Sequence, residues 1–195
     1  MNELSFLLDI LDLKDEKRTG WELRNIEDPE SVADHSWSTA FLTLFYGMKE
    51  ESLDLDRSIK IAIVHDMAEA ETGDIATRAQ DKEQELSKQE KSDLEKQFFE
   101  NIASQDGEIL KLWKEYESKE TREAKFVNDM DKIDLCLQAL KYEKQKRYDP
   151  DEENENFQKY DNLDEFFATT ESRLKTSTGM ELFEDIREKY REVKQ

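Results

Sequence analysis

The chain has 195 residues and a formal net charge of -20, with 49 Asp and Glu against 29 Lys and Arg. This length is typical of one domain with a substantial core, so we expect a single domain over residues 1–195. The negative field repels phosphate backbones and anionic lipids, which argues against a nucleic acid polymer or a membrane as partner. An anionic substrate would therefore require a compact positive site, such as a metal ion or an arginine.

The N-terminal stretch MNELSFLLDILDLKDEKR lacks the basic start and the unbroken apolar core of a signal peptide, and its apolar residues predict an amphipathic helix over residues 2–13. No segment approaches the ~18 apolar residues that a membrane span requires. The single cysteine, Cys136, cannot form an internal disulfide, and we expect it to be an inert buried thiol. The expected compartment is the reducing cytoplasm.

Glycine and proline are scarce, and apolar residues recur at spacings of three and four. The sequence predicts an all-α fold, a helical bundle of about seven to nine helices with no significant sheet. A loop containing RTGWELRNIEDPE ends at Ser31, whose S-x-x-D pattern with Asp34 resembles a capping box and predicts a helix from about residue 31 to residues 47–51. One face of this helix is lined by Trp37, Phe41, Leu44, Phe45 and Met48, and we expect the aromatic residues among them, with Trp113 of a later helix, to lie in the core.

A third helix is predicted to begin after Asp56, as N-cap, and to continue through SIKIAIVHDMAEAET to Gly73. It is apolar on nearly all sides, so we expect it to be central and buried. Further predicted helices span residues 80–103, a charged surface helix with Leu86, Leu94, Phe98 and Ile102 as its apolar stripe, and then 106–118, 120–147, 162–174 and 179–193. Residues 1–147 form the expected core of the domain.

An acidic loop is predicted over residues 148–162. Its D-x-D start is compatible with calcium, but Asn154 and Tyr160 stand where an EF-hand loop requires Gly and Glu. Calcium binding is therefore not expected there.

The chain contains only two histidines, His35 and His65, and each is adjacent to an aspartate. A single histidine is more often structural than a ligand, although imidazole is the commonest transition-metal donor. A carboxylate beside an imidazole in a largely apolar helix is costly unless a cation compensates it, and no basic residue lies between Ile61 and Arg78. A divalent metal would compensate His65 and Asp66.

The order His35, His65-Asp66, Asp131 resembles the H…HD…D pattern of the HD-domain metal-dependent phosphohydrolases. The stretches RTGWELRNIEDPESVADHS, VHDMAEAETGDIA and AKFVNDMDKIDLCLQALKYE resemble the branch that includes 5′-deoxynucleotidases, which remove phosphate from deoxyribonucleoside 5′-monophosphates. This resemblance covers most of residues 1–147. It implies that one divalent metal is held by His35, His65, Asp66 and Asp131, and it suggests a homodimer.

Two imidazoles and two carboxylates suit Mn, Co, Fe, Ni or Zn before Mg, and the sequence does not choose among them. Such a cation lowers the pKa of bound water towards roughly 7 to 9, which makes hydroxide available as the nucleophile. Asp129 competes with Asp131 as the fourth ligand, but a two-residue offset turns its side chain away. The resemblance, and the helical face that Asp131 shares with Val127 and Asp134, favour Asp131.

Glu69 follows His65 by four residues, so a helix would place it on the same general face. The resemblance makes it the catalytic residue that orients the attacking water or relays its proton. A solvated helix carboxylate is the structural alternative. Glu71 would point away from His65 and is left out of the site.

The resemblance also assigns substrate contacts. It implies that Arg18 binds the substrate phosphate, for which a planar guanidinium is suited, and that Asp74 holds the sugar 3′-hydroxyl. Some relatives have a large aromatic residue directly after this arginine to exclude a 2′-hydroxyl, whereas Thr19 stands here, so ribose against deoxyribose stays open. Arg24 is a second candidate, either for the phosphate or for tying the loop to the helices.

The leading hypothesis is therefore a metal-dependent phosphomonoester hydrolase that acts on a small nucleotide, a deoxyribonucleoside 5′-monophosphate. The same site would serve a ribonucleotide, a cyclic nucleotide or another phosphate ester. A non-catalytic metal- or nucleotide-binding regulatory domain is the alternative from a different class. A structural metal site is normally closed and needs no extra carboxylate, so Glu69 and Asp74 count against that alternative.

Overall fold

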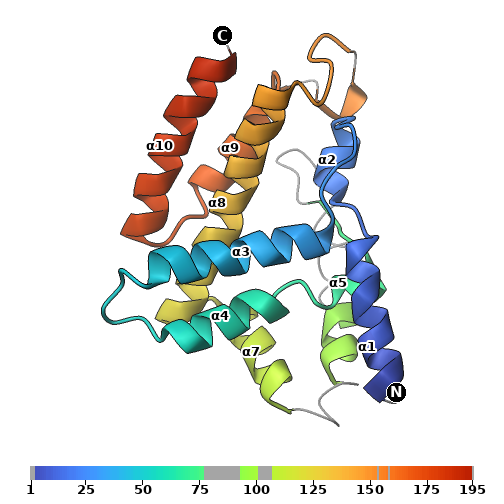
Figure 1. Cartoon of the computed structure of the whole chain (residues 1–195), viewed down its shortest axis with the longest axis vertical. Helices are drawn as coiled ribbons and strands as arrows, with labels where there is room; N and C mark the ends of the chain where they lie inside the picture. Colours follow the sequence, from blue (N-terminus) through green and yellow to red (C-terminus); the bar gives the residue numbers. More distant parts are fainter. Residues whose placement is uncertain (1–2, 77–92, 101–106, 153, 158, 195) are drawn as a thin grey trace.

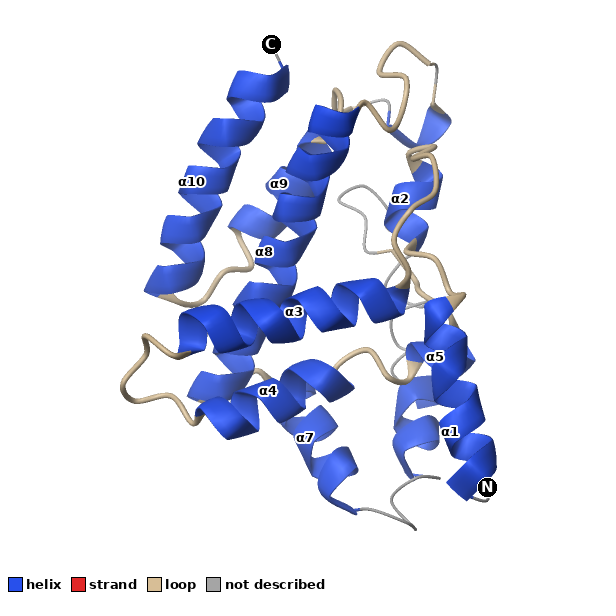
Figure 2. Ribbon diagram, in the orientation of Figure 1, coloured by secondary structure: helices blue, strands red, loops and turns tan. Residues whose placement is uncertain are grey.

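A computed structural model describes residues 3–76, 93–100, 107–152, 154–157 and 159–194. Helices dominate these residues (Figure 2), and the one β-type pairing among them is an isolated bridge between Lys17 and Ser31. The all-α prediction is therefore confirmed. Within the described chain no helix combines the length and the apolar character that a membrane crossing would demand.

The helices follow one another along the chain with short connections (Figure 1). They are α1 (Glu3–Leu11), η1 (Asp12–Lys14), α2 (Thr19–Leu23), α3 (Val32–Gly47), α4 (Leu55–Val64), α5 (Glu69–Thr72), a helical stretch at 93–100, α7 (Gly107–Ser118), α8 (Arg122–Gln145), η2 (Glu155–Phe157), α9 (Asp164–Glu171) and α10 (Ser177–Lys194).

Most predicted boundaries agree with these elements to within a few residues, including those of α7, α8 and α10. The predicted loop after α1 contains the short helix α2, because Trp21 on α2 is fully buried and fixes that segment against the core. Of the predicted helix over residues 80–103, only 93–100 falls among the described residues. Phe98 there is buried and Leu94 is half exposed, whereas Leu86 and Ile102 lie outside the described residues.

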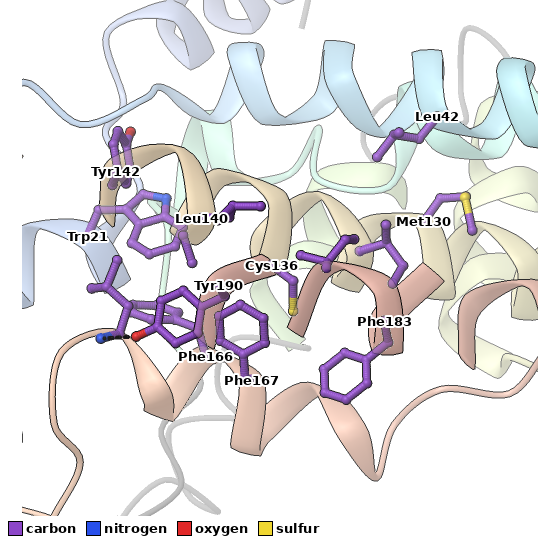
Figure 3. Packing of buried hydrophobic residues seen from close by; sticks show 14 of the residues in the cluster. Trp21, Leu42, Met130, Cys136, Leu140, Tyr142, Phe166, Phe167, Phe183 and Tyr190 are labelled. Carbon is purple, nitrogen blue, oxygen red and sulfur yellow. Dashed lines mark hydrogen bonds between the residues drawn. The ribbon is translucent and has the colours of Figure 1, made fainter. Parts of the chain in front are cut away.

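The centre of the fold is α8, which packs against α3, α4, α7, α9 and α10 (Figure 1). Buried residues occur on all sides of it, as expected of a helix enclosed by others. Figure 3 shows its apolar side chains lying between Leu42 of α3 and the aromatic rings of α9 and α10. The same enclosed helix carries Asp131 into the interior, where Asp131 is only 4% exposed.

The start of α3 is fixed by the predicted capping box. The Ser31 hydroxyl accepts a hydrogen bond from the Asp34 backbone N–H at 3.1 Å, and the Asp34 carboxylate accepts one from the Ser31 N–H at 2.9 Å. This reciprocal pair satisfies two N–H groups that the helix would otherwise leave unpaired. His35 follows directly and is completely buried.

The prediction that the aromatic face of α3 lies in the core is wrong. Trp37 is 69% exposed, and its neighbours on that face are exposed as well: Phe41, Leu44, Phe45 and Met48. The reason is that α3 has one interior side, and the side with His35, Thr39 and Leu42 occupies it. By contrast, Trp113 of α7 is buried as predicted.

The predicted third helix is also corrected. Its N-cap is Asp54 rather than Asp56, since the Asp54 side chain accepts the Arg57 N–H at 3.0 Å. The helix ends at Val64, and turns over residues 65–68 separate α4 from α5. The backbone there forms tighter three-residue hydrogen bonds, for example from the Glu69 N–H to the Asp66 carbonyl at 3.0 Å.

The start of α10 is held by Asp129 of α8. Its carboxylate accepts hydrogen bonds from the backbone N–H groups of Lys175 and Thr176 and from the Thr176 hydroxyl, at 2.7 to 2.9 Å. Gly179 lies against this carboxylate, because a Cβ added at Gly179 would come within 2.5 Å of Asp129 Oδ2. The buried charge is therefore fully hydrogen-bonded only if position 179 has no side chain.

We expect Gly179→Ala to lower the free energy of unfolding by about 1 to 3 kcal/mol, the usual cost of overpacking a tight site. Gly107→Ala is the matched control, because nothing lies within 4 Å of an added Cβ there. Urea unfolding of both variants measures the effect. Equal midpoints for the two variants would contradict this account of the contact.

Candidate active site

Three segments bring the four predicted metal ligands together: α3 supplies His35, the turns that follow α4 supply His65 and Asp66, and α8 supplies Asp131. His35 Nε2 lies 3.4 Å from Asp131 Oδ1 and 3.7 Å from Asp66 Oδ2. His65 Nε2 lies 3.2 Å from the same Asp66 oxygen, and the two imidazole ring centroids are 5.4 Å apart. His35 Nε2, His65 Nε2 and a carboxylate oxygen of Asp66 thus all lie within 4.8 Å of one another, and Asp131 joins this group through its contact with His35.

The Nδ1 atom of each imidazole is already in a hydrogen bond. His35 Nδ1 donates to Asp134 Oδ2 at 2.8 Å, and His65 Nδ1 donates to the Ala62 carbonyl at 2.7 Å. Both Nε2 atoms are buried and have no hydrogen-bond partner among the described residues. An imidazole whose Nδ1–H is engaged in this way presents its Nε2 lone pair, which is the arrangement of metal-binding histidines. The residues therefore fit a divalent cation.

The charges of the cluster support the same fit. The carboxylates of Asp66, Glu69, Asp74 and Asp131 outnumber the nearby cations, Arg18 and Lys132. Removing such charges from water is costly unless opposite charge compensates them. A divalent cation would neutralise the local excess.

The protonation of the ligands follows from this crowding. Burial alone would raise the pKa of Asp66, but His65 and Arg18 outweigh burial and hold that pKa well below its usual range. Burial and the charge of Arg18 oppose protonation of His35, yet the carboxylates of Asp131 and Asp134 raise its pKa to about 10, so a cation that binds Nε2 would displace a proton from it.

Asp131 is oriented by two donors on its second oxygen. The Tyr116 hydroxyl donates to Asp131 Oδ2 at 2.7 Å, and Lys132 Nζ donates to it at 2.8 Å. Oδ1 consequently faces His35. Burial opposes ionisation of Asp131, but Lys132 and His35 hold its pKa well below the usual value, whereas burial and Asp131 raise the pKa of Tyr116.

Sequence reasoning missed three residues that orient the ligands. Asp134, Tyr116 and Lys132 contact either His35 or Asp131. The available signal was the spacing of Asp134, one helical turn after Asp131. The competing candidate Asp129, also on α8, directs its carboxylate to the backbone at the start of α10 instead.

The predicted catalytic and substrate residues lie beside the cluster. Glu69 is 4% exposed, and its carboxylate is 3.6 Å from Arg18 Nη1. Arg18 Nη1 also donates to Asp74 Oδ1 at 2.8 Å and lies 3.3 Å from Asp66 Oδ2. The Thr19 backbone N–H donates to the other Asp74 oxygen at 2.7 Å. Arg18 and Asp74 are thus paired with each other at the edge of the site.

A cavity of about 420 Å³ opens beside these residues. Its wall includes Arg18, Glu69, Asp74 and the predicted ligands His65, Asp66 and Asp131, with aromatic and apolar residues from α2, α8 and α9. Arg24 is not part of this wall. It donates to the Asn162 carbonyl at 2.9 Å and lies over the Tyr148 ring, so it ties the loop to the C-terminal segment. Cys136 is buried away from solvent, which raises its pKa to about 12.

Comparison with known proteins identifies the family of the chain. The family model described as HD domain matches residues 10–170. The chain belongs to the HD-domain family. A protein of Bos taurus named 5′-deoxynucleotidase HDDC2 is 40% identical over 143 residues, which cover 73% of this chain and 68% of the relative. A Danio rerio protein of the same name is 34% identical over 192 residues, covering 96% and 87%.

Solved structures of other proteins share the fold. A conserved hypothetical protein from Pyrococcus furiosus superposes with a TM-score of 0.71 at 29% identity, covering 95% of this chain and 99% of that one. The HD phosphohydrolase DatZ of cyanophage S-2L, bound to dA and one catalytic Zn²⁺ ion, has a TM-score of 0.55 at 18% identity, covering 96% and 95%, and shows likeness of fold alone. The prediction of an HD-domain metal-dependent phosphohydrolase is confirmed.

Asp134 gives a direct test of the ligand geometry. We expect Asp134→Asn to weaken divalent metal binding by about 10- to 100-fold, because the carboxylate behind His35 orients the imidazole and increases its basicity. Asp185→Asn, on an exposed carboxylate of α10, should leave binding unchanged. Competition titration with Mn²⁺ and a fluorescent chelator measures both variants. Unchanged affinity in Asp134→Asn would show that His35 does not need this partner.

Proposed function

We propose that this HD-domain protein hydrolyses deoxyribonucleoside 5′-monophosphates to deoxynucleoside and phosphate, with one divalent transition metal. The observation that carries the proposal is that two buried Nε2 atoms, which have no hydrogen-bond partner among the described residues, lie against the carboxylates of Asp66 and Asp131 beside an open cavity. The names of the mammalian and fish relatives support the substrate class.

The metal would be held by His35, His65, Asp66 and Asp131. When bound, it would activate water and neutralise charge on the phosphate. Its identity is proposed only as Mn, Co, Ni, Fe or Zn, since imidazole with carboxylate suits all of these cations.

Glu69 is the proposed catalytic carboxylate. It comes from α5, just beyond the turns that interrupt α4, and is buried beside Asp66 and Arg18 at the cavity wall. In this position it would orient the attacking water or accept its proton. Glu71, two residues later, is exposed to solvent and does not line the cavity.

Arg18 is proposed to bind the substrate phosphate and Asp74 the sugar 3′-hydroxyl. Both line the cavity, and their mutual hydrogen bond fixes each relative to Glu69. Each oxygen of Asp74 accepts one hydrogen bond from the segment at Arg18 and Thr19, which leaves lone pairs for a hydroxyl donor. A guanidinium held by carboxylates can transfer its donors to a phosphate without leaving the site.

The alternatives use the same cavity. A ribonucleotide, a cyclic nucleotide or another phosphate ester would need the same metal ligands, and Thr19 provides no bulky ring against a 2′-hydroxyl. A non-catalytic binding domain is disfavoured by the open cavity beside Glu69.

Phosphate release from a panel of deoxyribo- and ribonucleoside 5′-monophosphates tests the proposal. With Mn²⁺ or Co²⁺ added, we expect release from the deoxyribonucleotides and its loss on chelation. A metal-loaded protein that releases no phosphate from any member of the panel would refute the proposed activity.

Glu69→Gln should lower turnover by about 10²- to 10⁴-fold while Mn²⁺ binding is retained, because the substitution removes the proton acceptor but keeps the shape of the side chain. Glu71→Gln is the matched control and should keep wild-type turnover. Undiminished turnover in Glu69→Gln would rule out the assigned role.

We also propose that the chain forms a homodimer through the exposed aromatic stripe of α3. This stripe consists of Trp37, Phe41 and Phe45. The rings of Trp37 and Phe41 stack with centroids 5.6 Å apart, and those of Phe41 and Phe45 with centroids 6.1 Å apart, so the three exposed rings form a continuous row. Monomers rarely expose a contiguous apolar face of this kind. A second copy fits it because a two-fold interface places the same apolar stripe on both sides.

Phe41→Glu should convert a dimer to a monomer, since it would bury a charge at the centre of that interface. Met180→Glu, at a half-exposed methionine on α10, is the control and should not alter the assembly. Light scattering after size-exclusion chromatography gives the mass. A wild-type monomer, or a dimeric Phe41→Glu protein, would refute this interface.

Two further proposals concern the whole chain. One domain over residues 1–195 is supported by a single apolar cluster that contains Trp21 near one end and Tyr190 near the other. A reducing cytoplasmic location is compatible with the free, buried thiol of Cys136.

A further inference from the structure

Lys132 occupies an unusual position for a lysine. It follows the metal ligand Asp131 on α8, its side chain is 22% exposed, and it lines the same cavity as Arg18 and Glu69. Its ammonium lies 2.8 Å from Asp131 Oδ2. Lys132 on α8 therefore brings a second positive charge to the ligand cluster, in addition to that of Arg18, which precedes α2.

The ammonium of Lys132 has N–H donors that make no hydrogen bond within the described residues. A lysine ammonium has three N–H donors, and within the described residues Lys132 uses one of them, towards Asp131. Asp131 does not depend on that bond alone, because the Tyr116 hydroxyl donates to the same oxygen at 2.7 Å. Lys132 can therefore turn towards a ligand in the cavity while Asp131 Oδ2 keeps a donor.

The two cations have different surroundings. Arg18 Nη1 lies within 3.6 Å of Asp66, Glu69 and Asp74, so much of its charge is compensated inside the protein. Lys132 has one carboxylate within ion-pair distance among the described residues. In a chain of net charge -20, Lys132 is the less compensated cation beside the proposed metal.

From this geometry we propose that Lys132 is a second phosphate-binding residue that donates to a terminal oxygen of the substrate phosphate. The inference rests on the proposed function, because the ligand is the phosphate of the same monoester. A phosphate monoester has three terminal oxygens, and the metal and Arg18 would contact two of them. Lys132, a flexible point charge, suits the third oxygen.

The competing role for Lys132 is that of a counterion, which would merely keep Asp131 ionised. The two roles differ in what they affect. A counterion acts through Asp131 and changes metal binding, whereas a phosphate contact changes phosphate binding at constant metal occupancy.

The test compares wild-type protein with Lys132→Gln and Lys132→Arg, each saturated with Mn²⁺. In isothermal titration with inorganic phosphate, the affinity of Lys132→Gln should be at least about tenfold lower than that of the wild type. This is the usual loss for a hydrogen bond to a charged group. Lys132→Arg should restore binding to within about threefold, because it keeps the charge and the donors. Titration with deoxyadenosine, which has no phosphate, should give equal affinities for all three proteins.

Lys119→Gln is the matched control, since Lys119 lines the same cavity but its ammonium lies over the Tyr116 ring. It should bind phosphate as the wild type does. Wild-type phosphate affinity in Lys132→Gln would overturn the inference, and so would an equal loss of deoxyadenosine affinity. A fall in Mn²⁺ affinity as large as the fall in phosphate affinity would assign the counterion role instead.

These readouts are separate from the proposed activity. If the wild-type protein released no phosphate from any monophosphate, the proposed function would fail, yet the phosphate titrations would still report on Lys132. If turnover is present and the Lys132→Gln protein binds phosphate normally, only the inference about Lys132 fails.

Discussion

The placement of a buried Asp131 and a partly buried Asp66 against two imidazoles is the constraint on which the rest of the structure depends. Ionised carboxylates in a protein interior are strongly destabilising unless opposite charge or donors surround them. Arg18, Tyr116 and Lys132 supply part of that compensation, and the remaining deficit is what a divalent cation would fill. The same excess of negative charge that destabilises the folded protein therefore also favours the binding of a cation.

Several features of the fold follow from solving that problem. His35 occupies the interior side of α3, so the aromatic side of that helix faces outward. The turns at residues 65–68 interrupt an otherwise apolar helix, and the His65 Nδ1–H donates to a backbone carbonyl three residues earlier. Enclosure of α8 on all sides brings acidic residues into the core, and each is held by a named donor or imidazole.

The sequence predicted most securely what depends on local rules. The scarcity of Gly and Pro and the helical spacing predicted the all-α fold, and the S-x-x-D pattern located the start of α3. The H…HD…D order selected side chains that the structure brings together. Periodicity alone could not tell which apolar face of α3 is interior, so Trp37 was misplaced. Tyr116 and Lys132 were missed because their contacts with Asp131 depend on tertiary packing or on side-chain conformation.

The clamp between Asp129 and the first residues before α10 has a consequence for the boundaries of the domain. The family match ends at residue 170, yet the backbone groups that satisfy the Asp129 charge belong to Lys175 and Thr176. A fragment cut at the family boundary would strand an ionised carboxylate in its interior two residues from Asp131. The minimal folding unit of this protein therefore extends beyond residue 170, where the match to the HD-domain family ends.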